Sequence, residues 1–180
     1  METAFLRDFA MYAAIFGAFS FVWFGWAQEN PPKKWRAWLG VGSGVGLLVA
    51  ALGGFLASQN WHAGSALKAD PSAYTFYLAV VAFEVVLSFV GAMWLQKHGK
   101  PQLVAPWIAL VVGLHFAPLA LVFQDTWLYV LAALVAGGVI TAYAISRRTK
   151  LPVNTLACAF TGAILLVFAL RGLALFLANK

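Results

Sequence analysis

The sequence predicts an all-α membrane protein, in which residues 1–180 form one bundle of six transmembrane helices. Of the 180 residues, 63% are hydrophobic and only 10% are charged, whereas soluble domains are about half apolar and about a quarter charged. The apolar residues also form runs of about twenty, the length that a helix needs to cross about 30 Å of hydrocarbon. A transmembrane β-barrel would instead show alternating polarity in segments of about ten residues.

Six apolar runs have the required length, and polar residues separate them. The predicted spans cover residues 9–27, 37–57, 73–95, 102–123, 127–146 and 153–178. Residues 30–34, which contain two prolines and two lysines, end the first span. The polar residues 58–70 follow the second span, and Asp70 with Pro71 supplies an N-cap and a first-turn proline for the third helix.

The later breaks are shorter but equally clear. Residues 97–101 contain two lysines, a glycine and a proline, and they end the third helix. The connection at residues 124–126 is tight, and Asp125 there is expected to cap the fifth helix. Residues 147–150 carry three positive charges before Pro152 and the sixth helix. No loop is long enough to hold a soluble domain.

The distribution of Lys and Arg predicts the orientation of the bundle. The first, third and fifth loops hold eight of these residues, namely Lys33, Lys34, Arg36, Lys97, Lys100, Arg147, Arg148 and Lys150. The opposite side holds three, namely Arg7, Lys68 and Lys180. Because positively charged loops stay in the cytoplasm, we expect both termini on the outer side of a bacterial cytoplasmic membrane. The net charge of +6 then favours anionic lipid headgroups, and nothing indicates nucleic-acid binding.

Small residues on the second predicted helix indicate close helix packing. They recur every four residues, at Gly42, Gly46, Ala50 and Gly54. A face of this kind lets the backbone of a neighbouring helix approach closely. The neighbour is expected within the same chain or in a second copy, as a homo-oligomer.

Three ionisable side chains fall within the predicted spans: Glu84, His115 and Arg171. A charged group is costly in hydrocarbon, so each of them needs a partner or water. At about 1.5 Å of rise per residue, all three lie between the membrane midplane and the outer leaflet. They would form one polar cluster if the third, fourth and sixth spans were neighbours.

Two further patterns surround these residues. The polar or small side chains of the third helix share one face, which holds Tyr77, Glu84, Ser88 and Gly91. In the fourth helix, His115 is followed three residues later by Pro118, which removes a backbone donor and predicts a hinge. Interrupted helices at membrane depth often hold the substrate or ion sites of transporters.

Two interpretations of these ionisable residues stay open. In the structural one, Glu84 and Arg171 form an ion pair and His115 contributes a hydrogen bond that stabilises the bundle. In the functional one, Glu84 and His115 bind or pass protons or a solute, while Arg171 sets the local potential or receives an anionic group. Tyr77 and Ser88 then line the same path.

Several kinds of site are excluded. Every lysine lies outside the predicted spans, so retinal has no attachment point, and one histidine in a span cannot form a bis-histidine haem site. Cys158 has no second cysteine to pair with, and no phosphate-binding loop is present. We therefore expect no cofactor and no metal. An intramembrane enzyme that uses Glu84 and His115 as base and acid on a lipid would lack a nucleophile, so an enzyme is the less favoured class.

Residues 106–120 resemble the G-x-H-F-x-P-L-A segment of small bacterial six-span membrane proteins. The matching positions are Gly113, His115, Phe116, Pro118, Leu119 and Ala120. The resemblance extends to residues 24–29. It implies that His115 and Pro118 belong to one feature, and it implies no activity. The general plan is also similar to that of small channels for urea or short acids.

From these observations we expect a multi-pass protein that transports a small solute, alone or coupled to protons. The path would be lined by Glu84, His115, Arg171, Tyr77 and Ser88. The alternative is a lipid- or ligand-binding sensor, immunity or assembly subunit that holds a headgroup on Arg171. The expected partners are membrane lipids, a small solute or proton, and a second copy of the chain.

Overall fold

The computed structural model describes residues 5–69 and 71–180 of the chain. In these residues, six long helices are formed: α1 (Leu6–Ala27), α2 (Arg36–Gln59), α4 (Pro71–Lys97), α5 (Val104–Val122), α6 (Trp127–Arg148) and α7 (Val153–Ala178). Three short elements connect them: η2 (Lys33–Trp35), α3 (Ala66–Ala69) and η3 (Pro101–Leu103). The same residues contain no β-strand. The prediction of an all-α bundle of six helices is confirmed.

Each of the six long helices is long and apolar enough to cross a membrane, so the protein is a multi-pass membrane protein. With 22 residues, α1 is about 33 Å long, close to the thickness of the hydrocarbon core. The helix bounds lie within a few residues of the predicted spans. The largest difference is at the start of α1, which begins at Leu6 rather than at residue 9. The N-cap predicted at Asp70 lies outside the described residues.

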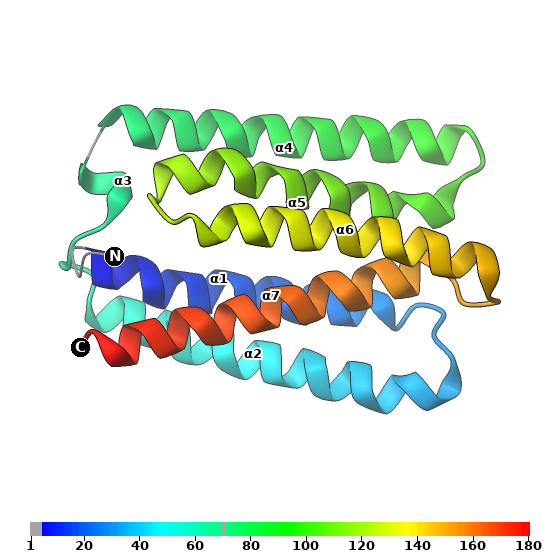
Figure 1. Cartoon of the computed structure of the whole chain (residues 1–180), viewed down its shortest axis with the longest axis horizontal. Coiled ribbons are helices and arrows are strands. Elements are labelled where there is room, and N and C mark those ends of the chain that lie inside the picture. The colour runs from blue at the N-terminus through cyan, green and yellow to red at the C-terminus, as the bar shows by residue number, and fades with distance from the viewer. Residues whose placement is uncertain (1–4, 70) are drawn as a thin grey trace.

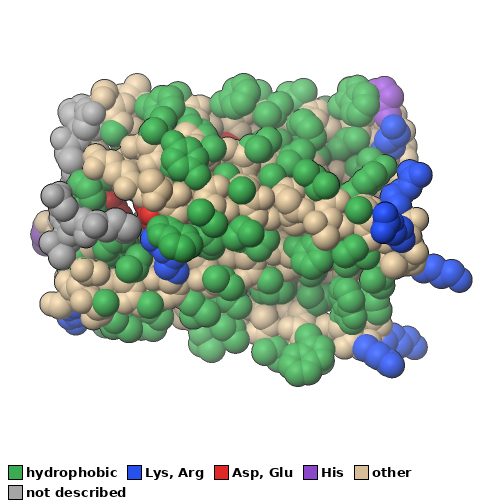
Figure 2. All heavy atoms as spheres, viewed as in Figure 1, with side chains coloured by type: hydrophobic (Ala, Val, Ile, Leu, Met, Phe, Trp, Pro, Cys, Tyr) green, Lys and Arg blue, Asp and Glu red, His purple; other side chains and the backbone are tan. Residues whose placement is uncertain are grey.

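The helices run alongside one another, and their connections alternate between the two ends of the bundle (Figure 1). The start of α1, the end of α7 and the connection between α5 and α6 lie at one end. At the other end lie the connections that follow α1, α4 and α6, and most of the Lys and Arg side chains visible in Figure 2 gather there. The charge asymmetry seen in the sequence is therefore an asymmetry between the two ends of the bundle.

Helix α1 forms the centre of the bundle because it packs closely on both α2 and α7. A Cβ atom added at Gly17 would lie 2.7 Å from the backbone nitrogen of Ala50, and one at Gly46 would lie 2.8 Å from that of Phe21. Both distances are too short for a real side chain, so glycine allows the backbones of α1 and α2 to meet. On the other side of α1, the buried hydroxyl of Ser20 ties this helix to α7, since its Oγ donates to the Gly162 carbonyl at 2.9 Å.

The small residues predicted on α2 are divided between two faces. Gly46 and Ala50 contact α1, and Gly42 lies against the ring of Phe24. Gly54 is exposed with open space around it, and Gly53 packs on α1 in its place. Residues four apart advance by about 40° around a helix, so three such steps turn Gly54 by about 120° away from Gly42.

Helix α4 is the peripheral helix of the bundle. Among the long helices it packs mainly on α5, and most of its side chains are exposed. In Figure 1 it lies along the edge of the bundle, on the side opposite α2. The sparse contacts leave room for a cavity between α4 and the rest of the bundle.

Candidate functional site

Glu84 and His115 meet where α4 packs on α5. Glu84 lies halfway along α4, about 20 Å from either helix end. Its Oε2 atom lies 3.5 Å from His115 Nδ1, and the two side chains retain only 18% and 13% of their exposure. The structure therefore brings together two of the three ionisable residues singled out in the sequence.

The hydrogen-bond geometry of His115 shows which of its two ring nitrogens carries a proton. Nδ1 lies 2.6 Å from the carbonyl oxygen of Val112, and a carbonyl only accepts, so Nδ1 carries a proton and donates it. The Glu84 Oε2 atom lies farther from the same nitrogen, at 3.5 Å. Among the described residues, Nε2 of His115 has no hydrogen-bond partner, and His115 is the one polar contact recorded for the Glu84 carboxylate. The pair thus retains unused hydrogen-bonding capacity.

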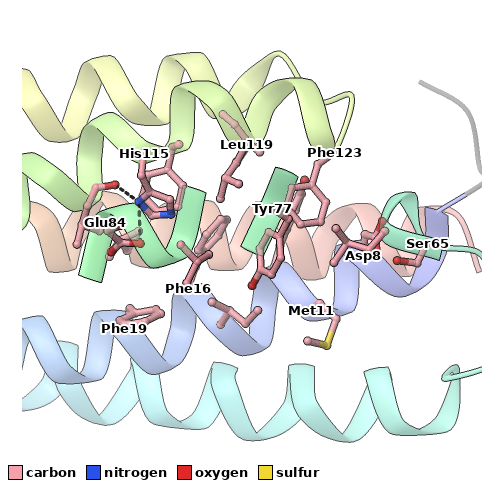
Figure 3. Close-up of a pocket in the computed structure, with 18 of the residues that line it drawn as sticks. Asp8, Met11, Phe16, Phe19, Ser65, Tyr77, Glu84, His115, Leu119 and Phe123 are labelled. Atoms are coloured by element: carbon pink, nitrogen blue, oxygen red, sulfur yellow. Dashed lines mark hydrogen bonds and ion pairs between the residues drawn. The ribbon is translucent and has the colours of Figure 1, made fainter. Parts of the chain in front are cut away.

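A cavity of about 290 Å³ extends from this pair toward the end of the bundle where α1 begins. We refer to it as the bundle cavity. Figure 3 shows Glu84 and His115 at one end, Asp8 and Ser65 at the other, and aromatic rings between them. The rings lining the cavity are those of Tyr12, Phe16, Phe19, Trp61, Tyr77, Phe116 and Phe123. Most of the lining is apolar, and the polar groups are concentrated at its two ends.

A second hollow of about 430 Å³ lies between α4 and α5 and shares Glu84 and His115 with the first. We refer to it as the lipid-facing groove. Its other lining residues are apolar, and two of them, Phe83 and Leu114, are 68% and 55% exposed. In a membrane, these side chains face lipid. Glu84 and His115 therefore lie at the junction between the bundle cavity and the surrounding membrane.

The far end of the bundle cavity is formed by a polar group of residues that the sequence analysis missed. Asp8 Oδ2 accepts the backbone N–H of Ala66 at 2.8 Å. Arg7 Nη1 donates to the Trp61 carbonyl at 3.1 Å, and its guanidinium carbon lies 4.9 Å from the centre of the Trp61 ring. Arg7 and Asp8 were placed outside the first predicted span, whereas α1 begins at Leu6 and buries both. No local pattern marks them, because their contacts are with residues more than fifty positions away in the chain.

Arg171 does not join Glu84 and His115, because α4 and α7 do not pack on each other and the cluster of three was expected only if they did. Its Nη1 and Nη2 atoms donate to the Asp125 carboxylate at 3.0 and 3.4 Å, and its guanidinium carbon lies 5.1 Å from the centre of the Trp127 ring. The predicted Glu84–Arg171 ion pair is absent for the same reason. A long Arg side chain extends toward the nearer helix end, where Asp125 offers a carboxylate. Asp125 Oδ1 also accepts the Trp127 N–H at 3.0 Å, although the N-cap position of α6 is occupied by Thr126 rather than by Asp125 as expected.

The remaining predicted residues have different surroundings. Tyr77 lines the bundle cavity, with its ring edge-on to that of Phe123 at 6.2 Å. Ser88 lines neither hollow, and its buried hydroxyl has no hydrogen-bond partner among the described residues. Pro118 lines the lipid-facing groove, and α5 continues through it without a break. Gly91 lies against the indole of Trp107, which fits between the two helices.

Within the described part of the chain, no three His, Cys, Asp or Glu side chains converge as they would around a metal ion. No protein-family model, curated protein or solved structure matches this chain. Function is therefore inferred from the geometry of the residues themselves.

Proposed function

We propose that this protein transports a small amphipathic solute between the membrane and the aqueous phase at one end of the bundle. The observation that carries the proposal is the position of Glu84 and His115, which line both the lipid-facing groove and the bundle cavity. A solute dissolved in the membrane can approach them through the groove. The cavity then leads from them toward the residues around Asp8 and Ser65 (Figure 3).

The apolar lining of the cavity favours a solute with an apolar body. A fully polar solute would lose its hydration in the cavity without gaining hydrogen bonds along most of the path. A solute with one polar group can instead place that group on Glu84 and His115 and its apolar part against Phe16 and Tyr77. This proposal narrows the small solute expected from the sequence to an amphipathic one.

Coupling to protons is part of the proposal. A carboxylate and an imidazole are the side chains best suited to exchange protons near neutral pH, and intramembrane pairs of this kind form proton relays in pumps and transporters. Movement of α4 would open and close the site, because this helix has few contacts besides those with α5. Pro118, which cannot donate a backbone hydrogen bond, lies on the α5 side of the same junction.

We further propose that the membrane is the bacterial cytoplasmic membrane and that both termini lie outside. This orientation is supported by the concentration of Lys and Arg at the opposite end of the bundle (Figure 2). The end of the bundle cavity near Asp8 would then open toward the outer side.

Transport can be tested with two solutes of similar size that cross lipid slowly because of their charge: benzyltrimethylammonium and phenylmethanesulfonate. Proteoliposomes containing wild-type protein are expected to take up at least one of them faster than protein-free liposomes. Val81→Trp, which fills the bundle cavity, should abolish the difference. The control is Val85→Trp, one turn further along α4, where the side chain is exposed to lipid. Uptake that resists Val81→Trp would argue against this path.

A binding protein that transports nothing is the second candidate, and the accessibility of the junction from lipid favours it. Arg171 is not favoured as its headgroup site, since Asp125 engages that guanidinium and neither residue lines the bundle cavity or the lipid-facing groove. A bound amphipathic molecule would instead use Glu84 and His115. Native mass spectrometry that finds a retained molecule, together with no uptake of either solute, would select this candidate.

A further inference from the structure

We infer that the bundle cavity binds a hydrophobic organic cation, with Glu84 as its counter-ion. The inference rests on the proposed function, because it names the chemical class of the solute at that same site. It follows from the charges at the cavity, from the rings along it and from its size.

The charged residues lining the bundle cavity, among those described, are Arg7, Asp8 and Glu84. The Arg7 guanidinium is held by the carbonyl and the ring of Trp61. The nearest polar atom to the Glu84 carboxylate belongs to His115, whose N–H group is directed first to the Val112 carbonyl. The formal charges of Arg7 and Asp8 offset each other at the far end of the cavity, so its net negative charge comes from Glu84. A cation would be attracted to the Glu84 end, whereas an anionic solute would be repelled there.

The walls of the cavity suit the same class of ligand. Seven aromatic side chains line it, and two of them, Phe16 and Tyr77, lie between Glu84 and Asp8 (Figure 3). The ring of Phe16 is further packed by Tyr12 at 5.3 Å and by Phe116 at 5.5 Å, so it is fixed in place. Aromatic faces attract ammonium groups, and they accommodate alkyl and aryl groups equally well. A carboxylate beside such rings is typical of sites for quaternary ammonium ions.

The size of the cavity limits the ligand further. At about 290 Å³, it is at the lower end of the range for small-molecule sites. It therefore fits a cation with one ring or a short chain, and it is too small for a two-chain phospholipid.

The inference can be tested with radiolabelled benzyltrimethylammonium as the probe and purified protein in lipid nanodiscs. Neopentylbenzene is its neutral isostere, with carbon in place of nitrogen, and phenylmethanesulfonate is an anion of similar shape. We expect saturable binding of the probe, with each competitor at least about tenfold weaker than unlabelled probe in displacing it.

Three variants of the protein test whether Glu84 is the counter-ion of the bound cation. Glu84→Gln keeps the size of the side chain and removes its charge, and it is expected to weaken probe binding at least about tenfold. Glu84→Asp keeps the charge and should retain part of the affinity. Glu29→Gln is the matched control, because Glu29 follows α1 at the opposite end of the bundle, accepts a hydrogen bond from Asn154 in the first turn of α7, and lines neither hollow.

Three outcomes of the binding experiment would overturn the inference. The first is the absence of saturable probe binding to folded wild-type protein. The second is equal displacement by the neutral isostere, and the third is unchanged binding to Glu84→Gln. Transport of phenylmethanesulfonate alone in the liposome experiment would also overturn it while supporting the proposed function, so the two can fail separately.

Discussion

Arg171 donates two hydrogen bonds to Asp125, and this pair joins α7 to the tight connection between α5 and α6. The carboxylate side chain retains only 3% of its exposure, and the Nη1–Oδ2 distance is 3.0 Å. The pair lies apart from both hollows, so its role is to hold helices together. Of the two charged side chains predicted within the spans, Arg171 is thus held in a contact between helices, whereas Glu84 lies at the junction of the two hollows.

Replacing Arg171 is expected to destabilise the protein without stopping transport. Arg171→Leu leaves the buried Asp125 carboxylate without a cationic partner. In comparable buried pairs, such a loss lowers the free energy of unfolding by about 3 kcal/mol. Thermal unfolding in detergent would measure this loss. The double variant with Asp125→Asn should recover part of it, because no charge is then left buried. Uptake in liposomes, normalised to folded protein, should stay close to wild type; a complete loss of uptake would place Arg171 in the path.

Replacing Glu84 is expected to reduce transport without destabilising the protein, the opposite of the result expected for Arg171. Glu84→Gln removes a charge from an apolar region, so the midpoint of thermal unfolding should stay the same or rise. Uptake of the solute should fall at least about tenfold, because the polar contact with the solute is weakened. The two measurements together separate a functional carboxylate from one that stabilises the bundle. A large drop in stability with normal uptake would identify Glu84 as structural.

Adding a side chain at Gly17 is expected to separate α1 from α2. The added Cβ would lie 2.7 Å from the Ala50 nitrogen and 2.9 Å from the Gly46 oxygen, and these backbone atoms cannot turn aside. Gly17→Val should therefore destabilise the bundle by several kcal/mol or prevent its folding, as overpacking does. Gly25→Val on the same helix is the control, because open space surrounds that glycine. Size-exclusion profiles and thermal unfolding of both variants would compare the two positions.

The seam between α4 and α5 can be tested at Gly91. A Cβ atom there would overlap the indole of Trp107, whose Nε1 donates to the Leu87 carbonyl at 3.2 Å. Gly91→Ala is expected to push α4 away from α5, lower the thermal stability and reduce uptake, since Glu84 and His115 would separate. Gly137→Ala on α6, with open space around it, should change neither quantity. If Gly91→Ala also left thermal stability and uptake unchanged, the close packing of α4 on α5 at Gly91 would not be what positions Glu84 and His115.

The helices were predictable because crossing hydrocarbon is a property of each segment alone. The meeting of Glu84 and His115 was also accessible, since α4 and α5 are consecutive and residues at equal depth on such helices lie level. Arg171 was misplaced because its depth was taken from its Cα position, whereas its long side chain reaches a carboxylate several ångströms nearer the helix end. Asp125 had been considered only as a cap, although a carboxylate can cap a helix and pair with a guanidinium at once.

The polar end of the cavity was not predictable from hydropathy. Arg7 and Asp8 precede the apolar run, and a charged pair at that point usually lies in water. Their burial depends on the segment around Trp61 and Ala66 folding back over the start of α1. That contact joins residues more than fifty positions apart, and no local pattern specifies it.

The packing of α1 on α7 also bears on how the protein is made. Ser20 and Gly162, which share a hydrogen bond across this contact, lie 142 residues apart in the chain. During synthesis, α1 and α2 can associate as soon as both have entered the membrane, whereas the opposite face of α1 has no permanent neighbour until α7 follows. Until then, that face must be covered by lipid or by the insertion machinery. Completion of the bundle therefore waits for the insertion of α7.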